Sequence, residues 1–258
     1  MGRAADMGEA CGYLSYALEK MSDIAIIIPT YNAAEGIAAE IEGIKRIVPQ
    51  ASIYIVDDSS PDKTAEIVNS TFAGDKRIKV LVRKGKLGRG SAVIAGFQEA
   101  LKNKDIQYFI EMDADLCHDP KYIQEMIKTS RERKADIVIA SKYHPQSTIA
   151  GLTFKRIFMS KLMNLSARLI LQVPVSDYSN GYRCYNRKAV AFLARQRFTS
   201  CGFVVLSEIV YRSHKKGFTI AEIPFDFRQV STGKTNLNFK EIKEAAITLL
   251  KLRFSKIA

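Results

Sequence analysis

Residues 24–62 read IAIIIPTYNAAEGIAAEIEGIKRIVPQASIYIVDDSSPD. The β-branched run at 24–28 stops at Pro29, which is typical of a buried parallel strand. Isoleucines then recur at helical spacing until Pro49 breaks the pattern, and a second strand is predicted at 52–56. A strand, a helix and a second strand in this order indicate a β-α-β unit with parallel strands.

The same alternation continues through the first half of the chain and becomes less regular in the second. Strands are predicted at 78–82, 108–112, 137–140, within 177–186 and at 218–223. Helices are predicted at 61–72, 90–101, 153–171, 203–213 and 239–254, and one more begins with Asp119 as its N-cap and Pro120 as its first residue. No repeat or linker interrupts the chain. The pattern predicts an α/β fold, a mostly parallel sheet flanked by helices, in a single domain.

Composition limits the partners and the compartment. The chain has 258 residues, 47% of them hydrophobic, and a formal net charge of +12, which indicates an anionic partner such as nucleic acid, membrane headgroups or a phosphorylated small molecule. Four scattered cysteines without a Cys-x-x-Cys pair, and only three histidines, make a zinc site improbable and favour reduced thiols in the cytoplasm. No apolar run approaches the roughly 18 residues of a membrane span. Residues 1–20 lack the apolar core of a signal peptide and are expected to be an N-terminal extension.

Acidic or turn-forming clusters follow three of the predicted strands, at 29–32, 57–62 and 113–115. In an open parallel sheet, ligands bind beyond the carboxyl ends of the strands. Buried acidic residues are costly unless they bind something. The three clusters are therefore expected to share one ligand site.

Asp113 and Asp115 carry the sharpest chemical signal. Carboxylates two residues apart on an extended segment point to the same side and repel each other unless a cation lies between them. Hard oxygen ligands suit Mg²⁺ or Mn²⁺. An isolated Asp-x-Asp is more often a solvated loop, but its position between a strand and a proline-initiated helix favours a metal site. Asp57 and Asp58 fit a solvated turn and nucleotide recognition about equally well.

Two familiar nucleotide motifs are excluded. Residues 85–90 are rich in glycine and open a helix, but they lack the Gly-x-Gly-x-x-Gly order of a dinucleotide site. The run Gly233-Lys234-Thr235 ends like a P-loop, yet Arg228 stands where the first glycine would be required.

With these motifs, the chain resembles family 2 glycosyltransferases of the GT-A fold, and most closely the dolichol-phosphate mannose synthase and polyprenyl-phosphate glycosyltransferase group. The resemblance runs from about residue 24 to 239. Its motifs are IPTYN at 28–32, VDDSSPDKT at 56–64, KLGRG at 86–90, MDADLCH at 112–118, ASKY at 140–143, DYSNGYR at 177–183, Gly-Phe at 202–203 with Glu208, and EIPF at 222–225 followed by Arg228.

The resemblance implies roles for individual residues. Pro29, Tyr31, Val56 and Asp58 are implied to form the nucleoside pocket. The metal–diphosphate site is implied to consist of Asp113, Ala114 and Asp115, with the two carboxylates as metal ligands and catalytic groups. Lys142 and Arg228 are implied to contact the diphosphate or the acceptor phosphate, and Lys234 is a further substrate-binding candidate.

The chain departs from the family pattern at four places. Ala33 replaces the usual acidic residue, and Cys117 replaces the glutamine or serine beside the metal. Lys142 stands where arginine is usual, which exchanges a bidentate fork for a point charge. The lysine of the family's Gly-x-Ser-Lys run is shifted to Lys234.

Together these features predict a metal-dependent, inverting glycosyltransferase that uses Mg²⁺ or Mn²⁺. The donor is expected to be a nucleoside-diphosphate sugar, with GDP-mannose favoured and a UDP-sugar as the second option, bound by residues 21–143. Residues 144–258 are expected to bind the acceptor, a polyprenyl or dolichyl phosphate. Because such a phosphate has a second pKa of about 6, it arrives ionised and needs no general base. A hydroxyl of a glycan or glycolipid would need one, and Asp177 or Glu208 are the candidates.

Three alternatives remain at this level. The basic amphipathic helices at 153–171 and 239–254 either lie on an anionic membrane, as a peripheral contact at its cytoplasmic face, or pack on the sheet with their cations solvated. A nucleic-acid-binding protein is disfavoured because the basic residues are spread along the chain, so no nucleic-acid partner is expected. A nucleotidyltransferase would need a glycine- and arginine-rich loop after the first strand, and residues 29–36 offer none.

Overall fold

The computed structural model describes residues 20–198, 200, 204–230 and 239–254. Its helices are η1 (Lys20–Asp23), α2 (Ile37–Ile47), α3 (Thr64–Thr71), α4 (Arg89–Ala100), α5 (Tyr122–Glu132), α6 (Phe154–Leu171), α7 (Arg187–Leu193), α8 (Val204–Lys215) and α9 (Phe239–Phe254). Its strands are β1 (Ile24–Thr30), β2 (Ser52–Asp57), β3 (Ile78–Val82), β4 (Tyr108–Glu111), β5 (Ile137–Ser141), β6 (Ile149–Ala150), β7 (Arg183–Asn186), β8 (Ile220–Pro224) and β9 (Phe227–Arg228).

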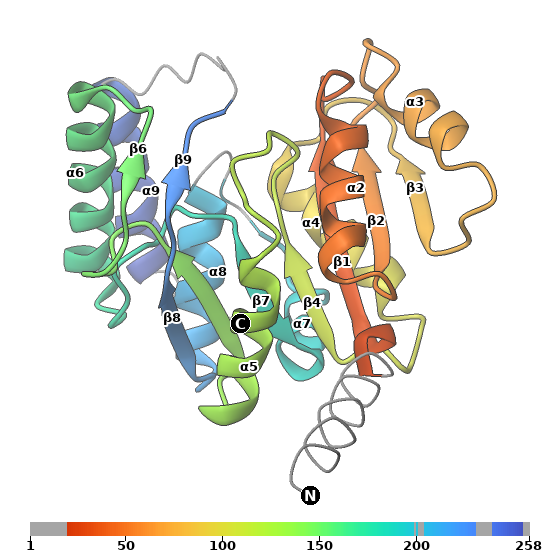
Figure 1. Cartoon of the computed structure of the whole chain (residues 1–258). Coiled ribbons are helices and arrows are strands. Elements are labelled where there is room, and N and C mark those ends of the chain that lie inside the picture. Colours follow the sequence, from red (N-terminus) through yellow and green to blue (C-terminus); the bar gives the residue numbers. More distant parts are fainter. Residues whose placement is uncertain (1–19, 199, 201–203, 231–238, 255–258) are drawn as a thin grey trace, which may run out of the picture.

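Seven strands form one sheet in the order β3-β2-β1-β4-β7-β5-β8, and only β7 runs antiparallel to its neighbours. β1 pairs with β2 on one side and β4 on the other, so that Ile26 lies opposite Ile53 and Ile110. Figure 1 shows the arrowheads of β1, β2 and β4 pointing to the same edge. The predicted α/β fold with a mostly parallel sheet in a single domain is confirmed.

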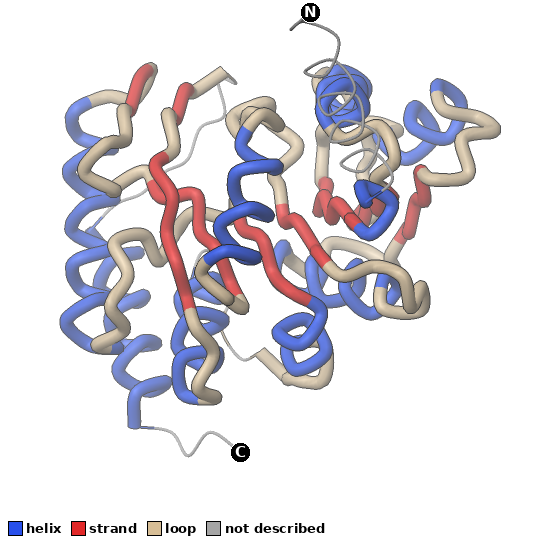
Figure 2. Tube along the Cα trace, turned by 60° about the horizontal axis from the view of Figure 1, so that its bottom comes forward, coloured by secondary structure: helices blue, strands red, loops and turns tan. Residues whose placement is uncertain are grey.

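Helices cover both faces of the sheet, as the tube view of Figure 2 shows. Alternate residues of β1 enter different cores: Ile26 packs with the α2 residue Ile41, and Ile27 packs with the α4 residue Phe97. One core is completed by α3 and α5, the other by α6, α7, α8 and α9. Coverage of both faces explains why β1 is apolar throughout instead of alternating.

The insertion of β7 between β4 and β5 shapes the ligand-binding edge. The chain leaves β5 at Ser141, forms β6 and α6, and returns as β7 beside β4. This return brings residues 177–182 against the segment that follows β4. At the adjacent side of the molecule, α6 and α9 pack against each other, and β6 and β9 form a separate two-stranded sheet (Figure 1). None of the described helices is both long and apolar enough to cross a membrane.

Most predicted elements are confirmed within one or two residues, and two helix starts are wrong. Helix α3 begins at Thr64 rather than 61, because the Asp62 carboxylate accepts hydrogen bonds from the backbone N–H and the hydroxyl of Thr64. Helix α5 begins at Tyr122, and its N-cap is Lys121 rather than Asp119. Short elements β6, β9 and α7 were not predicted. The expected extension at 1–20 lies, except for Lys20, outside the described residues.

Candidate active site

The Asp113-Ala114-Asp115 segment directly follows β4 at the carboxyl edge of the sheet. A tight turn fixes its shape. The Leu116 backbone is left-handed (φ 61°), and its N–H donates to the Glu40 carboxyl group of α2 at 3.0 Å. The Asp115 carboxylate accepts a hydrogen bond from the Cys117 N–H at 3.1 Å. The turn thus fixes the position of Asp115, one of the two predicted metal ligands.

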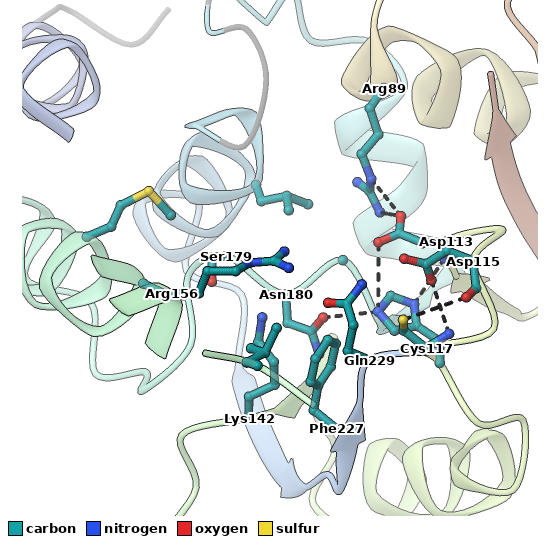
Figure 3. Close-up of a pocket in the computed structure, with 16 residues that line it drawn as sticks. Arg89, Asp113, Asp115, Cys117, Lys142, Arg156, Ser179, Asn180, Phe227 and Gln229 are labelled. Carbon is teal, nitrogen blue, oxygen red and sulfur yellow. Dashed lines mark hydrogen bonds and ion pairs between the residues drawn. The ribbon is translucent and has the colours of Figure 1, made fainter. Parts of the chain in front are cut away.

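Both carboxylates line a cavity of about 340 Å³. Figure 3 shows Asp113 and Asp115 on one side of it and Lys142 and Arg156 on the other. The remaining lining residues are Arg89, Cys117, His118, Leu152, Ser160, Met163, Ser179, Asn180, Gly181, Leu206, Phe227 and Gln229. The cavity therefore has an acidic wall, formed by Asp113 and Asp115 after β4. Its basic wall is formed by Lys142, directly after β5, and by Arg156 of α6.

Arg89, the first residue of α4, lies against the acidic wall. Its Nε donates to Asp113 Oδ1 at 2.8 Å, and its Nη1 pairs with Glu111 Oε1. Burial alone would lower the pKa of Arg89, but the Asp113 and Glu111 carboxylates raise it above its ordinary value. Although burial works the other way, the Arg89 guanidinium lowers the pKa of Asp113. Both groups therefore carry their charges at neutral pH.

His118 links the acidic segment to the loop before β7. The Asp113 backbone N–H donates to His118 Nδ1 at 3.0 Å, so the proton of the neutral ring lies on Nε2, which faces Asn180 Oδ1 at 3.1 Å. The ring stacks on Tyr182 at a centroid distance of 4.8 Å. Burial lowers the pKa of His118, which keeps the ring neutral. With both ring nitrogens engaged, His118 orients the site.

Asp177, a predicted candidate base, is fully buried and organises the loop. Its Oδ1 accepts from the backbone N–H groups of Ser179 and Asn180, both at 2.9 Å. Its Oδ2 accepts from the Lys142 N–H at 3.0 Å. The carboxylate thus fixes where Lys142 leaves β5, while Lys142 Nζ lies 5.1 Å from the centre of the Phe227 ring.

The other predicted acceptor-side residues do not converge on the cavity. Glu208 is buried in α8, where it pairs with Arg212 at 2.8 Å and accepts from the Ser200 N–H. Arg228 is exposed in β9 between two residues that line the cavity, and it is itself absent from the lining. Lys234 lies outside the described residues.

The predicted nucleoside residues lie along the same edge, beyond the ends of β1 and β2. Tyr31 is exposed, and Lys86 Nζ lies 4.0 Å from the centre of its ring. Pro29 is half-buried in β1, and Val56 is buried in β2. Asp58 is buried; Arg83 Nε donates to its carboxylate at 2.6 Å, and the N–H of Gly88 donates at 2.9 Å. Gly88 has φ 94°, a conformation that suits glycine.

The acidic wall fits a hard divalent cation that shares its ligands with a substrate. Within the described residues, no three His, Cys, Asp or Glu side chains converge on a point that could hold a metal. Mg²⁺ in nucleotide sites is commonly held by one or two carboxylates, with phosphates and water completing the shell. Asp113, whose side chain is 36% exposed, and Asp115 meet that requirement. Cys117, where the family pattern has a metal-proximal oxygen donor, is buried, with Sγ 3.6 Å from the Asp115 carbonyl oxygen.

Sequence reasoning missed Arg89, Glu111, His118, Asn180 and Arg156 as site residues. Arg89 lies within a glycine-rich run that was compared with a dinucleotide motif and belongs to the family resemblance, but no role was assigned to the arginine. Its position at the start of a helix after a strand was the available signal. Asn180 and His118 are 62 residues apart and meet only because β7 inserts beside β4. No local sequence pattern predicts that contact.

The fold is that of GT-A glycosyltransferases. Glucosyl-3-phosphoglycerate synthase from Mycobacterium tuberculosis, solved with Mn²⁺, UDP and glucosyl-3-phosphoglycerate, superposes with a TM-score of 0.64 at 18% identity. The match covers 92% of this chain and 82% of that one. The complex of the same enzyme with phosphoglyceric acid gives a TM-score of 0.65 at 16% identity.

The model of glycosyl transferase family 2 matches residues 25–193, and the chain belongs to this family of enzymes. It is similar to the polyprenol monophosphomannose synthase of Mycolicibacterium smegmatis, with 31% identity over 85% of this chain and 83% of the relative. The undecaprenyl-phosphate mannosyltransferase of Micrococcus luteus is 29% identical, over 88% of this chain and 92% of the relative. The chain is therefore a glycosyltransferase, as predicted.

Proposed function

We propose that this glycosyltransferase moves mannose from GDP-mannose to a polyprenyl phosphate, with inversion at the sugar, at the cytoplasmic face of a membrane. One observation carries the proposal. A single cavity places the carboxylates of Asp113 and Asp115 opposite the cations of Lys142 and Arg156. Such a cavity suits a metal-bound diphosphate on one wall and an acceptor phosphate on the other.

On the donor side, Asp113 and Asp115 would hold a divalent cation, Mg²⁺ or Mn²⁺. When bound, the cation neutralises the charge that grows on the leaving nucleoside diphosphate. Complexes of the structural neighbour contain Mn²⁺ with UDP, which supports a divalent cation in a site of this fold. Tyr31 and Asp58 lie beyond the neighbouring strands and would form the nucleoside end.

On the acceptor side, Lys142 and Arg156 would bind the phosphate of the lipid. Among the described candidates for a general base, Asp177 accepts three backbone hydrogen bonds, Glu208 pairs with Arg212, and both nitrogens of His118 are engaged. A phosphate acceptor needs no base, because it is ionised at neutral pH. Its oxygen would attack the anomeric carbon from the side opposite the departing diphosphate, which inverts that centre.

The surface of α6 and α9 supports action on a lipid. Apolar side chains at spacings of four, seven and four residues face solvent along α6, where Phe154 is 83% and Leu169 is 68% exposed. Phe158 and Leu165 complete the stripe, and α9 adds Ile247, Leu250 and Phe254. Exposed Lys155, Lys161 and Arg168 flank the stripe on α6. Apolar residues beside cations are the pattern of a helix lying on an anionic membrane.

Mannose is proposed because the two similar curated proteins are named for mannosyl transfer to polyprenol or undecaprenyl phosphate. The test is an assay with GDP-mannose, GDP-glucose, UDP-glucose and UDP-galactose, each with polyprenyl phosphate and with Mn²⁺, Mg²⁺ or EDTA. The expected result is transfer of label from GDP-mannose into the organic phase, one GDP released per mannose, and no transfer in EDTA. Preference for a UDP-sugar would replace the donor, and release of pyrophosphate would contradict the reaction class.

A further inference from the structure

Arg89 pairs with one oxygen of the Asp113 carboxylate, a proposed metal ligand. Its Nη2 lies 2.7 Å from Asp113 Oδ1, its Nε donates to the same oxygen, and its Nη1 pairs with Glu111. Glu111 is fully buried and is held from its other side by the Tyr185 hydroxyl at 2.7 Å. The guanidinium is therefore anchored from within the sheet by Glu111. Figure 3 shows it reaching Asp113 at the cavity wall.

The guanidinium keeps unused capacity to donate. Nη2 is buried and, despite its short distance to Asp113, makes no hydrogen bond of acceptable angle. Arg89 also lines the cavity and is the first residue of α4, whose first turn contains no acidic residue. The amino end of a helix favours anions over cations. A phosphate entering the cavity would thus meet both an unused donor and a helix amino terminus.

The chain leaves room for the Arg89 side chain by keeping glycine at position 181. A Cβ added to Gly181 would lie 2.0 Å from Arg89 Nη2 and 2.7 Å from its Cζ. Gly181 belongs to the loop that Asp177 and Asn180 organise, so this loop and Arg89 are packed directly against each other. Any larger residue at 181 would push the guanidinium away from its present position.

We propose that Arg89 is a positioning residue that makes metal binding depend on the nucleotide. Without nucleotide, Arg89 neutralises Asp113 and leaves Asp115 as the remaining carboxylate for a cation. A nucleoside diphosphate supplies phosphate oxygens that ligate the cation and accept from Arg89, which releases Asp113 to the metal. Metal and nucleotide then bind with positive coupling, which thermodynamic linkage makes reciprocal. This inference rests on the proposed function, because it assumes a nucleoside diphosphate beside Asp113 and Asp115.

The experiment measures Mn²⁺ affinity with and without GDP by calorimetry and by the EPR signal of free Mn²⁺, with no acceptor present. Removing Arg89 alone would leave Glu111 charged and buried, so the reference is Glu111→Gln and the test variant is Glu111→Gln/Arg89→Met. The reference is expected to bind Mn²⁺ about tenfold more weakly than the test variant when GDP is absent. The gain in Mn²⁺ affinity on adding GDP is expected to be about tenfold larger in the reference, within the usual range of coupling factors.

Two further variants test the role of Arg89 without the Glu111→Gln substitution. Gly181→Ala retains Arg89 but displaces it, and is expected to raise Mn²⁺ affinity without GDP in the otherwise natural chain. Arg77→Met is the matched control, because Arg77 pairs with Asp75 before β3, away from the carboxyl edge. Its Mn²⁺ affinity should equal that of the natural chain.

The outcomes separate the two proposals. Equal Mn²⁺ affinities and equal effects of GDP in the Glu111→Gln reference and the Glu111→Gln/Arg89→Met test variant would overturn the role of Arg89. The proposed function would still stand. If the natural chain failed to bind Mn²⁺ in the presence of GDP and also in the presence of UDP, the proposed function would fail, and the inference would fail with it.

Discussion

The charged side chains at the two ends of the ligand-binding edge have different kinds of partners. Beyond β1 and β2, the aspartates are engaged within the chain: Asp57 accepts from Thr30 and Asp58 from Arg83 and Gly88. Beyond β5, the backbone of Lys142 is fixed by Asp177 while its ammonium group lies over the Phe227 ring at the cavity. At the end beside β1 and β2, the aspartates stabilise loops. At the end beside β5, the Lys142 ammonium group lies where a ligand can reach it. We infer that the donor end is preorganised and the acceptor end depends on its ligand's charge.

Asp113 and Asp115, the proposed metal ligands, lie where these two ends meet, and their loss should have the largest effect. Asp115→Asn keeps the acceptor for the Cys117 N–H but removes the negative charge. We expect kcat/KM to fall by about 10³-fold, which corresponds to about 4 kcal/mol of transition-state stabilisation. Thermal unfolding of the variant should match that of the natural chain. Activity within a few-fold of the natural level would remove Asp115 from the metal site.

The proposed acceptor end is tested next with Lys142→Met, which keeps an unbranched, slightly shorter side chain and removes its charge. A lost charged hydrogen bond is worth about 1.5–3 kcal/mol, so kcat/KM for the lipid phosphate should fall by about 10- to 100-fold. GDP affinity in the absence of acceptor should change less. Lys128→Met on the exposed side of α5 is the control and should behave like the natural chain. An equal loss in both variants would contradict a specific role for Lys142.

The surface of α6 that we propose to contact lipid should show a smaller effect. Replacing Leu165 and Leu169 with serine removes two exposed leucines from α6, and affinity for vesicles of 70% phosphatidylcholine and 30% phosphatidylglycerol should fall about tenfold. Val82→Ser removes an exposed apolar residue from β3 and serves as the control. Binding should also weaken with added salt, because exposed cations flank the stripe. Unchanged co-sedimentation of the double variant would remove α6 from the membrane contact.

The smallest effect concerns Glu40 of α2, which accepts a hydrogen bond from Leu116 in the turn after Asp113 and Asp115. Burial raises the pKa of Glu40 to about 8, above its ordinary 4.5. The folded state therefore holds a proton that the unfolded state releases, so this group makes stability fall as pH rises from about 4.5 to 8. In the natural chain, this group should lower the free energy of unfolding in urea by more than about 1 kcal/mol between pH 4.5 and pH 8. The Glu40→Gln variant should lack this decrease. Glu42→Gln, on the exposed side of α2, should leave the pH profile unchanged.

The donor end was largely predictable from sequence, because its strands and helices follow one another in chain order. Each predicted strand up to residue 112 exists, and Asp113 and Asp115 do line the cavity. The acceptor end was less predictable, because β7 enters the sheet between strands that precede it in the chain. The contact of His118 with Asn180 depends on that insertion. Asp177 looked like a candidate base in sequence, whereas its hydrogen bonds, visible only in three dimensions, make it a loop organiser.

In the proposed reaction, an ionised acceptor phosphate takes the place of a general base. The most direct measurement compares polyprenyl phosphate with the corresponding polyprenol as acceptors of mannose from GDP-mannose, between pH 5.5 and 8. We predict transfer only to the phosphate, with a rate that rises with ionisation of the phosphate around pH 6. Transfer to the polyprenol at a comparable rate would contradict it, because a hydroxyl acceptor requires a base that Asp177, Glu208 and His118, as they are bonded here, do not supply.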